Sequence, residues 1–226
     1  MKVILFDLGN TLIENVSINL VNGFVTFFGE TLSEDVLKQE IMLVAKKFNE
    51  RSDRELMILD LIRDIADRHN IDLGENVETR FLDAVEVDRS IDGVNEVLRF
   101  LKKQGYYLGV ISNTIFSGKA MRQRLIDLGY DDAFKFVLTS ADVTYRKPFK
   151  EIFERALSMV QKDLPEIKPE DVYFVGDSYE IDVLGSTKAG LKPIWLNVEN
   201  EKQNYNGLMI HKMFELQELI NKNMIK

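Results

Sequence analysis

Five short apolar runs, each followed by polar or turn residues, constrain the fold of this 226-residue chain most strongly. A continuous apolar run of this length is typical of a strand buried on both faces of a parallel sheet. The runs therefore predict a parallel sheet that is covered on both sides. They are KVILF at 2–6, YYLGVIS at 106–112, KFVLTS at 135–140, VYFVGD at 172–177 and PIWLN at 193–197.

Amphipathic helical patterns separate the later runs. The predicted helices span residues 93–105, 120–129, 148–160 and 181–190, with apolar side chains at helical spacing. The third begins at Pro148, whose fixed φ suits the first turn of a helix. Regular alternation of strand and helix predicts a doubly wound α/β fold with right-handed crossovers and helices on both faces of the sheet.

Residues 14–90 interrupt this alternation, because they contain no convincing buried strand. The segment instead has the apolar spacing of helices. We therefore expect a catalytic core formed by residues 1–13 and 91–226, with residues 14–90 inserted as an all-helical cap. The helices expected in the insert span residues 33–50, 56–70 and 76–89.

Composition limits the partners of the chain. There are 29 basic and 37 acidic residues, and the resulting net charge of −8 argues against a nucleic-acid partner. The absence of cysteine excludes disulfides, thiolate nucleophiles and cysteine zinc sites. The apolar run near the N-terminus is too short for a signal peptide, and no run approaches the roughly 20 apolar residues of a membrane span. We expect a cytoplasmic protein without a membrane partner, either a monomer or a homodimer.

Polar residues follow the ends of four of these runs, where an open parallel sheet binds its ligands. Each of them has an ordinary explanation on its own, as a turn residue, a helix cap or a surface lysine. Their common position at strand ends favours a shared site. They are Asp7, Asn10 and Thr11, with the turn residue Gly9, after the first run, Ser112 and Asn113 at the end of the second, Lys147 after the third, and Asp177 and Asp182 at and beyond the end of the fourth.

This combination of side chains suits phosphoryl transfer. A carboxylate nucleophile divides one difficult displacement into two through an aspartyl-phosphate. A divalent cation offsets the repulsion between the carboxylate and the phosphate, and carboxylate oxygens are suitable ligands for Mg²⁺. A lysine and a hydroxyl or amide group can hold the non-bridging phosphate oxygens while charge shifts.

The same segments resemble the four motifs of the haloacid dehalogenase-like hydrolases, a superfamily mostly of phosphatases. VILFDLGNTL, LGVISNT, YRKPF and YFVGDSYEID occur in the order of those motifs. The resemblance covers residues 1–13 and about 91–200, and the insert is similar to a helical cap placed after the nucleophile. It implies a Rossmann-like core with an all-helical cap.

The resemblance also implies a role for each matching residue. Asp7 corresponds to the nucleophile, and Lys147 to the lysine that neutralises charge between nucleophile and phosphate. Mg²⁺ is expected on Asp7, the main-chain carbonyl of Gly9 and Asp177, with Asp182 supporting the water ligands of the metal. The phosphate of a small-molecule substrate is expected at Ser112, Asn113, Thr11 and Asn10.

One position departs from the family pattern. Phosphatases of this kind usually carry a second aspartate two residues after the nucleophile, where it protonates the leaving group, but this chain has Gly9. General acid–base catalysis commonly contributes about 10²–10⁴ in rate. The substrate expected is a small phosphomonoester, or an acyl phosphate whose leaving group needs little protonation.

Two alternatives remain open at Gly9. The namesake dehalogenases also lack the second aspartate and use no metal, so a metal-independent 2-haloacid dehalogenase is one alternative. A catalytically impaired phosphate-binding protein is the other. The pair Asp177 and Asp182 favours the phosphatase, because dehalogenases typically do not keep both carboxylates and because ionised carboxylates close to Asp7 need a cation.

Overall fold

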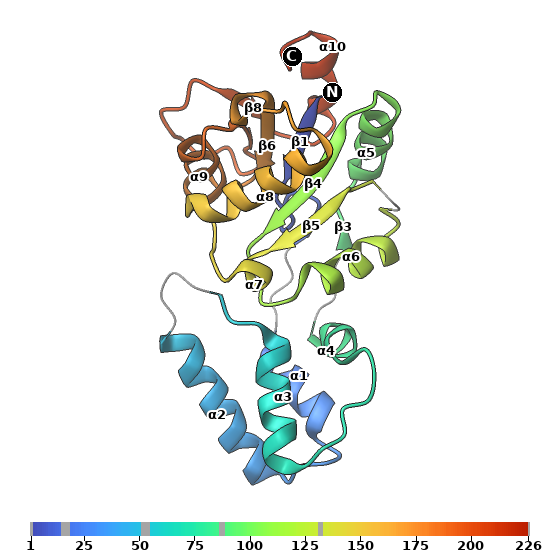
Figure 1. Cartoon of the computed structure of the whole chain (residues 1–226), viewed down its shortest axis with the longest axis vertical. Coiled ribbons are helices and arrows are strands. Elements are labelled where there is room, and N and C mark those ends of the chain that lie inside the picture. The colour runs from blue at the N-terminus through green and yellow to red at the C-terminus, as the bar shows by residue number, and fades with distance from the viewer. Residues whose placement is uncertain (1, 15–18, 51–54, 86–88, 131–132, 226) are drawn as a thin grey trace.

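The computed structural model describes residues 2–14, 19–50, 55–85, 89–130 and 133–225. Figure 1 shows two lobes, one built around a sheet with helices on its faces and one built from helices. The chain enters the helical lobe soon after the first strand and returns to the sheet before α5 (Val94–Lys103).

The sheet has six parallel strands in the order β5-β4-β1-β6-β7-β8, which confirms the predicted parallel sheet. The strand that leads to Asp7 is central, with one neighbour that ends near Asn113 and another that ends near Asp177. The strands are β1 (Val3–Phe6), β4 (Tyr107–Ser112), β5 (Phe136–Thr139), β6 (Val172–Gly176), β7 (Lys192–Leu196) and β8 (Leu208–Ile210).

Alternate residues of the strands point to opposite faces, and each face has its own hydrophobic cluster. Ile4 and Phe6 belong to one cluster, whereas Val3 and Leu5 belong to the other. Both clusters are covered by helices, so the doubly wound fold is confirmed. The core elements besides α5 are α6 (Gly118–Asp127), α7 (Ser140–Val143), α8 (Lys150–Asp163), η1 (Pro169–Asp171), η2 (Tyr179–Val183), α9 (Leu184–Lys188) and α10 (Glu215–Asn221).

The predicted helices over 148–160 and 181–190 begin differently in the structure for reasons that can be identified. The helix expected from Pro148 starts at Lys150, because Phe149 is extended and its N–H closes a turn onto Arg146 O. The helix expected over 181–190 is preceded by the single π-helical turn η2, which merges into α9. Apolar spacing does not distinguish such a turn from an ordinary helix start.

The helical lobe contains α1 (Leu20–Phe28), α2 (Glu34–Glu50), α3 (Ile58–His69) and α4 (Val77–Val85). Helix α4 ends before the predicted 76–89 boundary, and residues 86–88 lie outside the described part of the chain. On the sheet side of the junction between the lobes, β2 (Ile13–Glu14) pairs antiparallel with β3 (Arg89–Ser90), which lies near α6 (Figure 1). This ribbon was not predicted, since a two-residue strand has no readable periodicity.

Close packing of α1 against α4 holds the helical lobe together. Phe24 and Phe81 meet edge to face with ring centroids 4.9 Å apart. Gly23 permits this approach, because a Cβ there would lie 2.0 Å from Val85 Cγ1.

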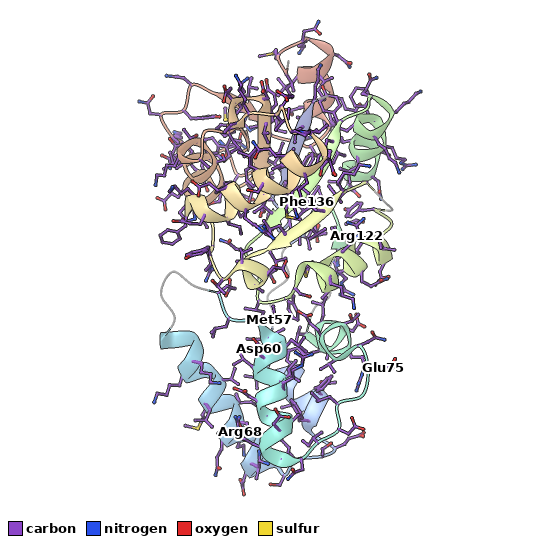
Figure 2. All side chains as sticks on the ribbon, in the orientation of Figure 1. Met57, Asp60, Arg68, Glu75, Arg122 and Phe136 are labelled. Atoms are coloured by element: carbon purple, nitrogen blue, oxygen red, sulfur yellow. The ribbon has the colours of Figure 1, made fainter. Side chains whose placement is uncertain are left out.

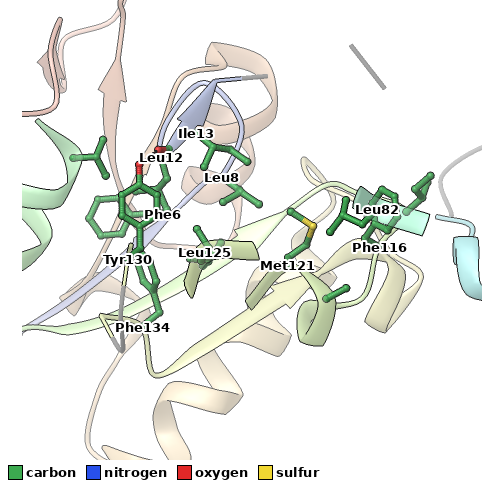
Figure 3. Close-up of a cluster of buried hydrophobic side chains, with 14 of the residues drawn as sticks. Phe6, Leu8, Leu12, Ile13, Leu82, Phe116, Met121, Leu125, Tyr130 and Phe134 are labelled. Carbon is green, nitrogen blue, oxygen red and sulfur yellow. Dashed lines mark hydrogen bonds between the residues drawn. The ribbon is translucent and has the colours of Figure 1, made fainter. Parts of the chain in front are cut away.

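Hydrophobic packing continues from the helical lobe into the core. Figure 3 shows Leu82 of α4 beside Phe116, and a row of buried side chains that runs from there through Met121 and Leu125 to Tyr130. The Tyr130 hydroxyl donates a hydrogen bond of 2.7 Å to Leu12 O in the loop after β1. The helical lobe and the loop that follows Asp7 therefore share one buried cluster.

Candidate active site

Asp7 and Lys147 meet at the carboxyl end of the sheet. Asp7 follows β1 and its N–H donates to Val175 O in β6, which fixes its backbone at the strand end. Lys147 Nζ pairs with Asp7 Oδ1 and, at 2.7 Å, with Asp182 Oδ1. The exposed fractions of the Asp7, Lys147 and Asp182 side chains are 11%, 1% and 2%, so the ammonium is enclosed between two buried carboxylates.

Asp182 reaches this position through a tight turn. Its Oδ2 accepts the Ser178 N–H at 3.0 Å at the start of η2, and its Oδ1 accepts Lys147. A Cβ on Gly176 would lie 2.5 Å from the Asp182 side chain. Glycine at the end of β6 is therefore a requirement of the site, and the sequence analysis did not single it out.

Asp177 lies beside this pair and is anchored from two directions. The Asn10 side chain hydrogen-bonds to its carboxylate, and Trp195 Nε1 donates to its main-chain O at 2.8 Å. The buried Trp195 ring thereby fixes the backbone of Asp177. One carboxylate oxygen from each of Asp7, Asp177 and Asp182 lies within 4.8 Å of the other two.

The loop after β1 is a compact turn. The N–H groups of Leu12 and Ile13 both donate to Leu8 O, at 2.8 and 3.0 Å, and Asn10 has a left-handed φ of 52°. Asparagine tolerates this conformation better than most residues. Thr11 is fully buried, and its Oγ1 has no hydrogen-bond partner among the described residues.

The predicted phosphate-binding residues at the end of β4, Ser112 and Asn113, lie on the other side of Asp7. Ser112 is the last residue of β4, is buried, and stands opposite Thr139 of β5. The Asn113 side chain donates to Lys147 O at 2.8 Å and accepts from Lys147 N at 2.7 Å. Asn113 thus clamps the backbone of the lysine, a contact that the sequence analysis did not foresee.

Burial and charge shift the ionisation of these groups. Burial raises the pKa of Asp7 to about 7, although the Lys147 ammonium opposes the rise. Burial also raises the pKa of Asp177, and the neighbouring Asp182 carboxylate adds to the effect. Burial acts to lower the pKa of Lys147, but the Asp182 and Asp7 carboxylates outweigh it, so the pKa is raised and the lysine stays charged.

These carboxylates form a site of the kind that holds a hard divalent cation. Among the described residues, the three carboxylates gather around one ammonium, that of Lys147, so the cluster has an excess of negative charge when it is ionised. Both oxygens of Asp182 are already engaged, by Lys147 and by Ser178 N. Oxygens of Asp7 and Asp177 are therefore the best-placed donors, and an all-oxygen set suits Mg²⁺, Mn²⁺ or Ca²⁺.

Comparison with known proteins identifies the family. The sequence model of the haloacid dehalogenase-like hydrolases matches residues 4–196, a range that extends from β1 to the end of β7. The chain belongs to this family. As a haloacid dehalogenase-like hydrolase it is an enzyme of the hydrolase class, with phosphatases among its relatives.

Two relatives illustrate this. The glyceraldehyde 3-phosphate phosphatase of Methanothermobacter thermautotrophicus is 35% identical over 138 residues, which cover 58% of this chain and 57% of that protein. The match thus spans little more than half the length of that relative. The pyrophosphatase PpaX of Bacillus cereus is 29% identical over 200 residues, which cover 85% of this chain and 81% of the relative.

The same fold is also found in a solved dehalogenase. The 2-haloacid dehalogenase from Pseudomonas syringae pv. Tomato DC3000 superposes with a TM-score of 0.68 at 21% identity, covering 98% of this chain and 99% of that one. This likeness establishes the shared architecture of a parallel-sheet core with a helical lobe.

In the described part of the chain, the helices are too short or too polar to cross a lipid bilayer.

Proposed function

We propose that this hydrolase is a magnesium-dependent phosphatase that acts on a small phosphorylated molecule through an aspartyl-phosphate on Asp7. The observation that carries the proposal is the buried contact of Asp7 with Lys147, beside Asp177 and Asp182. We also infer that residues 1–13 and 91–226 form the catalytic core, and that residues 14–90 form a cap that closes over the substrate and excludes water.

Asp7, Asp177 and the main-chain carbonyl of Gly9 are the groups that we assign to Mg²⁺. When bound there, Mg²⁺ supplies positive charge that polarises the phosphate and offsets its repulsion from the carboxylates. Asp182 keeps its place by bonding to Ser178 N and Lys147, so we assign it a supporting role around the metal.

The first chemical step is attack of a carboxylate oxygen of Asp7 on phosphorus. The bond between phosphorus and the leaving-group oxygen breaks, and the phosphoryl group is transferred to Asp7. Lys147 holds charge on a non-bridging oxygen, and water then hydrolyses the acyl phosphate to regenerate the carboxylate. The groups that we assign to the phosphate besides Lys147 are Ser112, Asn113, Asn10 and Thr11, whose Oγ1 has no hydrogen-bond partner in the described part of the chain.

Gly9 restricts which leaving groups depart easily. A glycine supplies no side-chain proton, so an alkoxide leaving group takes its proton from water or from a cap residue. An acyl phosphate releases a carboxylate that needs no proton. We therefore expect higher turnover with acyl phosphates than with simple alkyl phosphates.

Turnover with and without Mg²⁺ tests the proposal. We expect a panel containing acetyl phosphate, glyceraldehyde 3-phosphate, pyrophosphate and p-nitrophenyl phosphate to give phosphate release that depends on Mg²⁺ and is abolished by Asp7→Asn. Asp127→Asn, a change at an exposed carboxylate on α6, is the matched control and should leave turnover unchanged. Equal turnover by Asp7→Asn and wild type would contradict the proposal.

A metal-independent 2-haloacid dehalogenase is the second candidate, because a solved 2-haloacid dehalogenase shares this fold. The family resemblance also implies that dehalogenases lack the aspartate that Gly9 replaces. Halide release from a 2-haloacid in the presence of a chelator, without phosphatase activity, would favour it. Binding of Mg²⁺ and phosphate, without turnover of the phosphate compounds or of the 2-haloacid, would instead indicate a phosphate-binding protein.

A further inference from the structure

A buried carboxylate joins the helical lobe to the core close to Lys147. Glu55 lies at the start of the segment that leads into α3, and only 2% of its side chain is exposed. Figure 2 shows Met57, two residues further on, at the junction between the two lobes. A buried carboxylate needs partners, and Glu55 finds them in the core.

The first partner is Ser140, the first residue of α7. Ser140 is fully buried, and its Oγ lies 3.0 Å from Glu55 Oε2. The same Oγ accepts the Thr114 N–H at 2.9 Å and lies 3.1 Å from Thr114 O. Thr114 directly follows Asn113, which clamps the backbone of Lys147. Glu55 therefore reaches the lysine through Ser140 and the 113–114 loop.

The second set of partners lies in the loop that precedes Lys147. Arg146 Nε is 3.4 Å from Glu55 Oε2, and the Glu55 N–H donates to Thr144 O at 2.6 Å. Thr144 has a φ of +67°, which a β-branched residue adopts only under strain. Such a residue keeps its conformation when the surrounding contacts fix it, and Glu55 supplies one of these contacts.

We propose that Glu55 is a positioning residue that couples the helical lobe to Lys147. Its carboxylate and N–H hold the two loops that enclose the lysine, residues 113–114 and 144–147, so that the ammonium stays between Asp7 and Asp182. The inference rests on the proposed function only where it gives Lys147 a catalytic role.

A second carboxylate of the helical lobe provides a matched control. Glu78 of α4 accepts hydrogen bonds from Ser117 N and, at 2.6 Å, from Ser117 Oγ at the N-terminus of α6. It also docks the helical lobe onto the core, but these two hydrogen bonds lie outside residues 113–114 and 144–147. Glu55→Ala and Glu78→Ala therefore both weaken docking, and only the first should disturb Lys147.

Amide hydrogen exchange on the full chain tests the coupling without relying on turnover. We expect Glu55→Ala to speed exchange at Thr114 and Lys147 by about tenfold or more, because local opening exposes these amides. Glu78→Ala should speed exchange at Ser117 and leave the other two amides unchanged. The inference is wrong if the two variants change exchange at Thr114 and Lys147 equally, or if Glu55→Ala changes neither.

Kinetics with the best phosphate substrate of the panel provide the second readout. We expect Glu55→Ala to lower kcat by about 10- to 100-fold with little change in KM, since small displacements of a catalytic group have effects of this size. Glu78→Ala should change kcat by less than about twofold because Lys147 stays in place. A wild type without phosphatase activity would refute the proposed function, whereas equal loss of kcat in both variants would refute only the role of Glu55.

Glu55→Gln and Ser140→Ala keep the test decisive if Glu55→Ala does not fold. The Glu55→Gln variant keeps an acceptor for Ser140 but loses the charge that faces Arg146, so its effects should lie between those of wild type and Glu55→Ala. Ser140→Ala removes the hydroxyl that joins Glu55 to Thr114, and it should speed Thr114 exchange. Wild-type exchange in both variants would overturn the proposal.

Discussion

Replacing Lys147 by methionine should destabilise the metal-free protein strongly. The substitution removes the ammonium from between two carboxylates whose side chains are 11% and 2% exposed. Removing one partner of a buried ion pair costs about 3–5 kcal/mol, because the remaining charge is left uncompensated. With an unfolding entropy of about 2.1 cal/mol/K per residue, this corresponds over 226 residues to a fall in Tm of about 6–11 °C.

Thermal unfolding followed by circular dichroism, with a chelator present, measures this loss. The loss should be larger at about pH 8.5 than at about pH 5.5, because protonation of Asp7 removes one of the uncompensated charges at the lower pH. Adding Asp182→Asn to Lys147→Met should restore part of the stability, because it also removes one of the uncompensated negative charges.

Lys150→Met is the control for the loss of a lysine. Lys150 pairs with Glu154 on the surface of α8, where the two side chains are 59% and 54% exposed. Its substitution should leave Tm essentially unchanged, because an ion pair between exposed side chains contributes little to stability. If the free energy of unfolding of Lys147→Met were within about 1 kcal/mol of the wild-type value, the prediction would be wrong, because the Lys147 ammonium would not stabilise the buried carboxylates.

Three further predictions concern the same site. The free energy of unfolding of the metal-free wild type, relative to that of Asp7→Asn, should fall as pH rises from about 4 through about 7, because the folded protein holds the Asp7 proton more tightly than the unfolded chain does. Mg²⁺ should raise Tm more above this pH range than below it. Thermal melts at several pH values measure both effects. Gly176→Ala should cost about 1–3 kcal/mol in a urea titration and weaken Mg²⁺ binding, because its Cβ collides with Asp182, and unchanged stability would contradict the close approach. Gly9→Asp should raise kcat on alkyl phosphates at least about tenfold by supplying a general acid, with little gain on acyl phosphates; a uniform effect on both substrate classes would argue against the role assigned to this position.

The core could be predicted from sequence because its central strands β1, β4 and β6 are buried on both faces. Val172–Gly176 is a continuous apolar run, and the ends of such runs mark the edge of the sheet where we propose the active site. This is why Asp7 and Lys147, which are 140 residues apart in the chain, could be expected on the same edge, where the structure brings them together with Asp177 and Asp182.

Features that depend on single contacts escaped the sequence analysis. Glu55 looks like any charged residue near a helix start, because its partner Ser140 lies 85 residues away. The need for glycine at position 176 comes from the π-helical turn that presses Asp182 against the strand, and periodicity carries no signal for such a turn. The side-chain clamp of Asn113 on Lys147 likewise follows from loop geometry rather than from residue type.

The indole of Trp195 gives this molecule a built-in optical signal. Since the chain has one tryptophan, all tryptophan emission arises from a ring that donates a hydrogen bond to the main-chain O of Asp177. Its centroid lies 5.1 Å from that of the Tyr179 ring. An ion arriving at Asp177 changes the electric field at that ring, so titrating unlabelled protein with Mg²⁺ while recording its fluorescence should yield an affinity directly. Occupancy of the metal site can thereby be followed separately from catalysis.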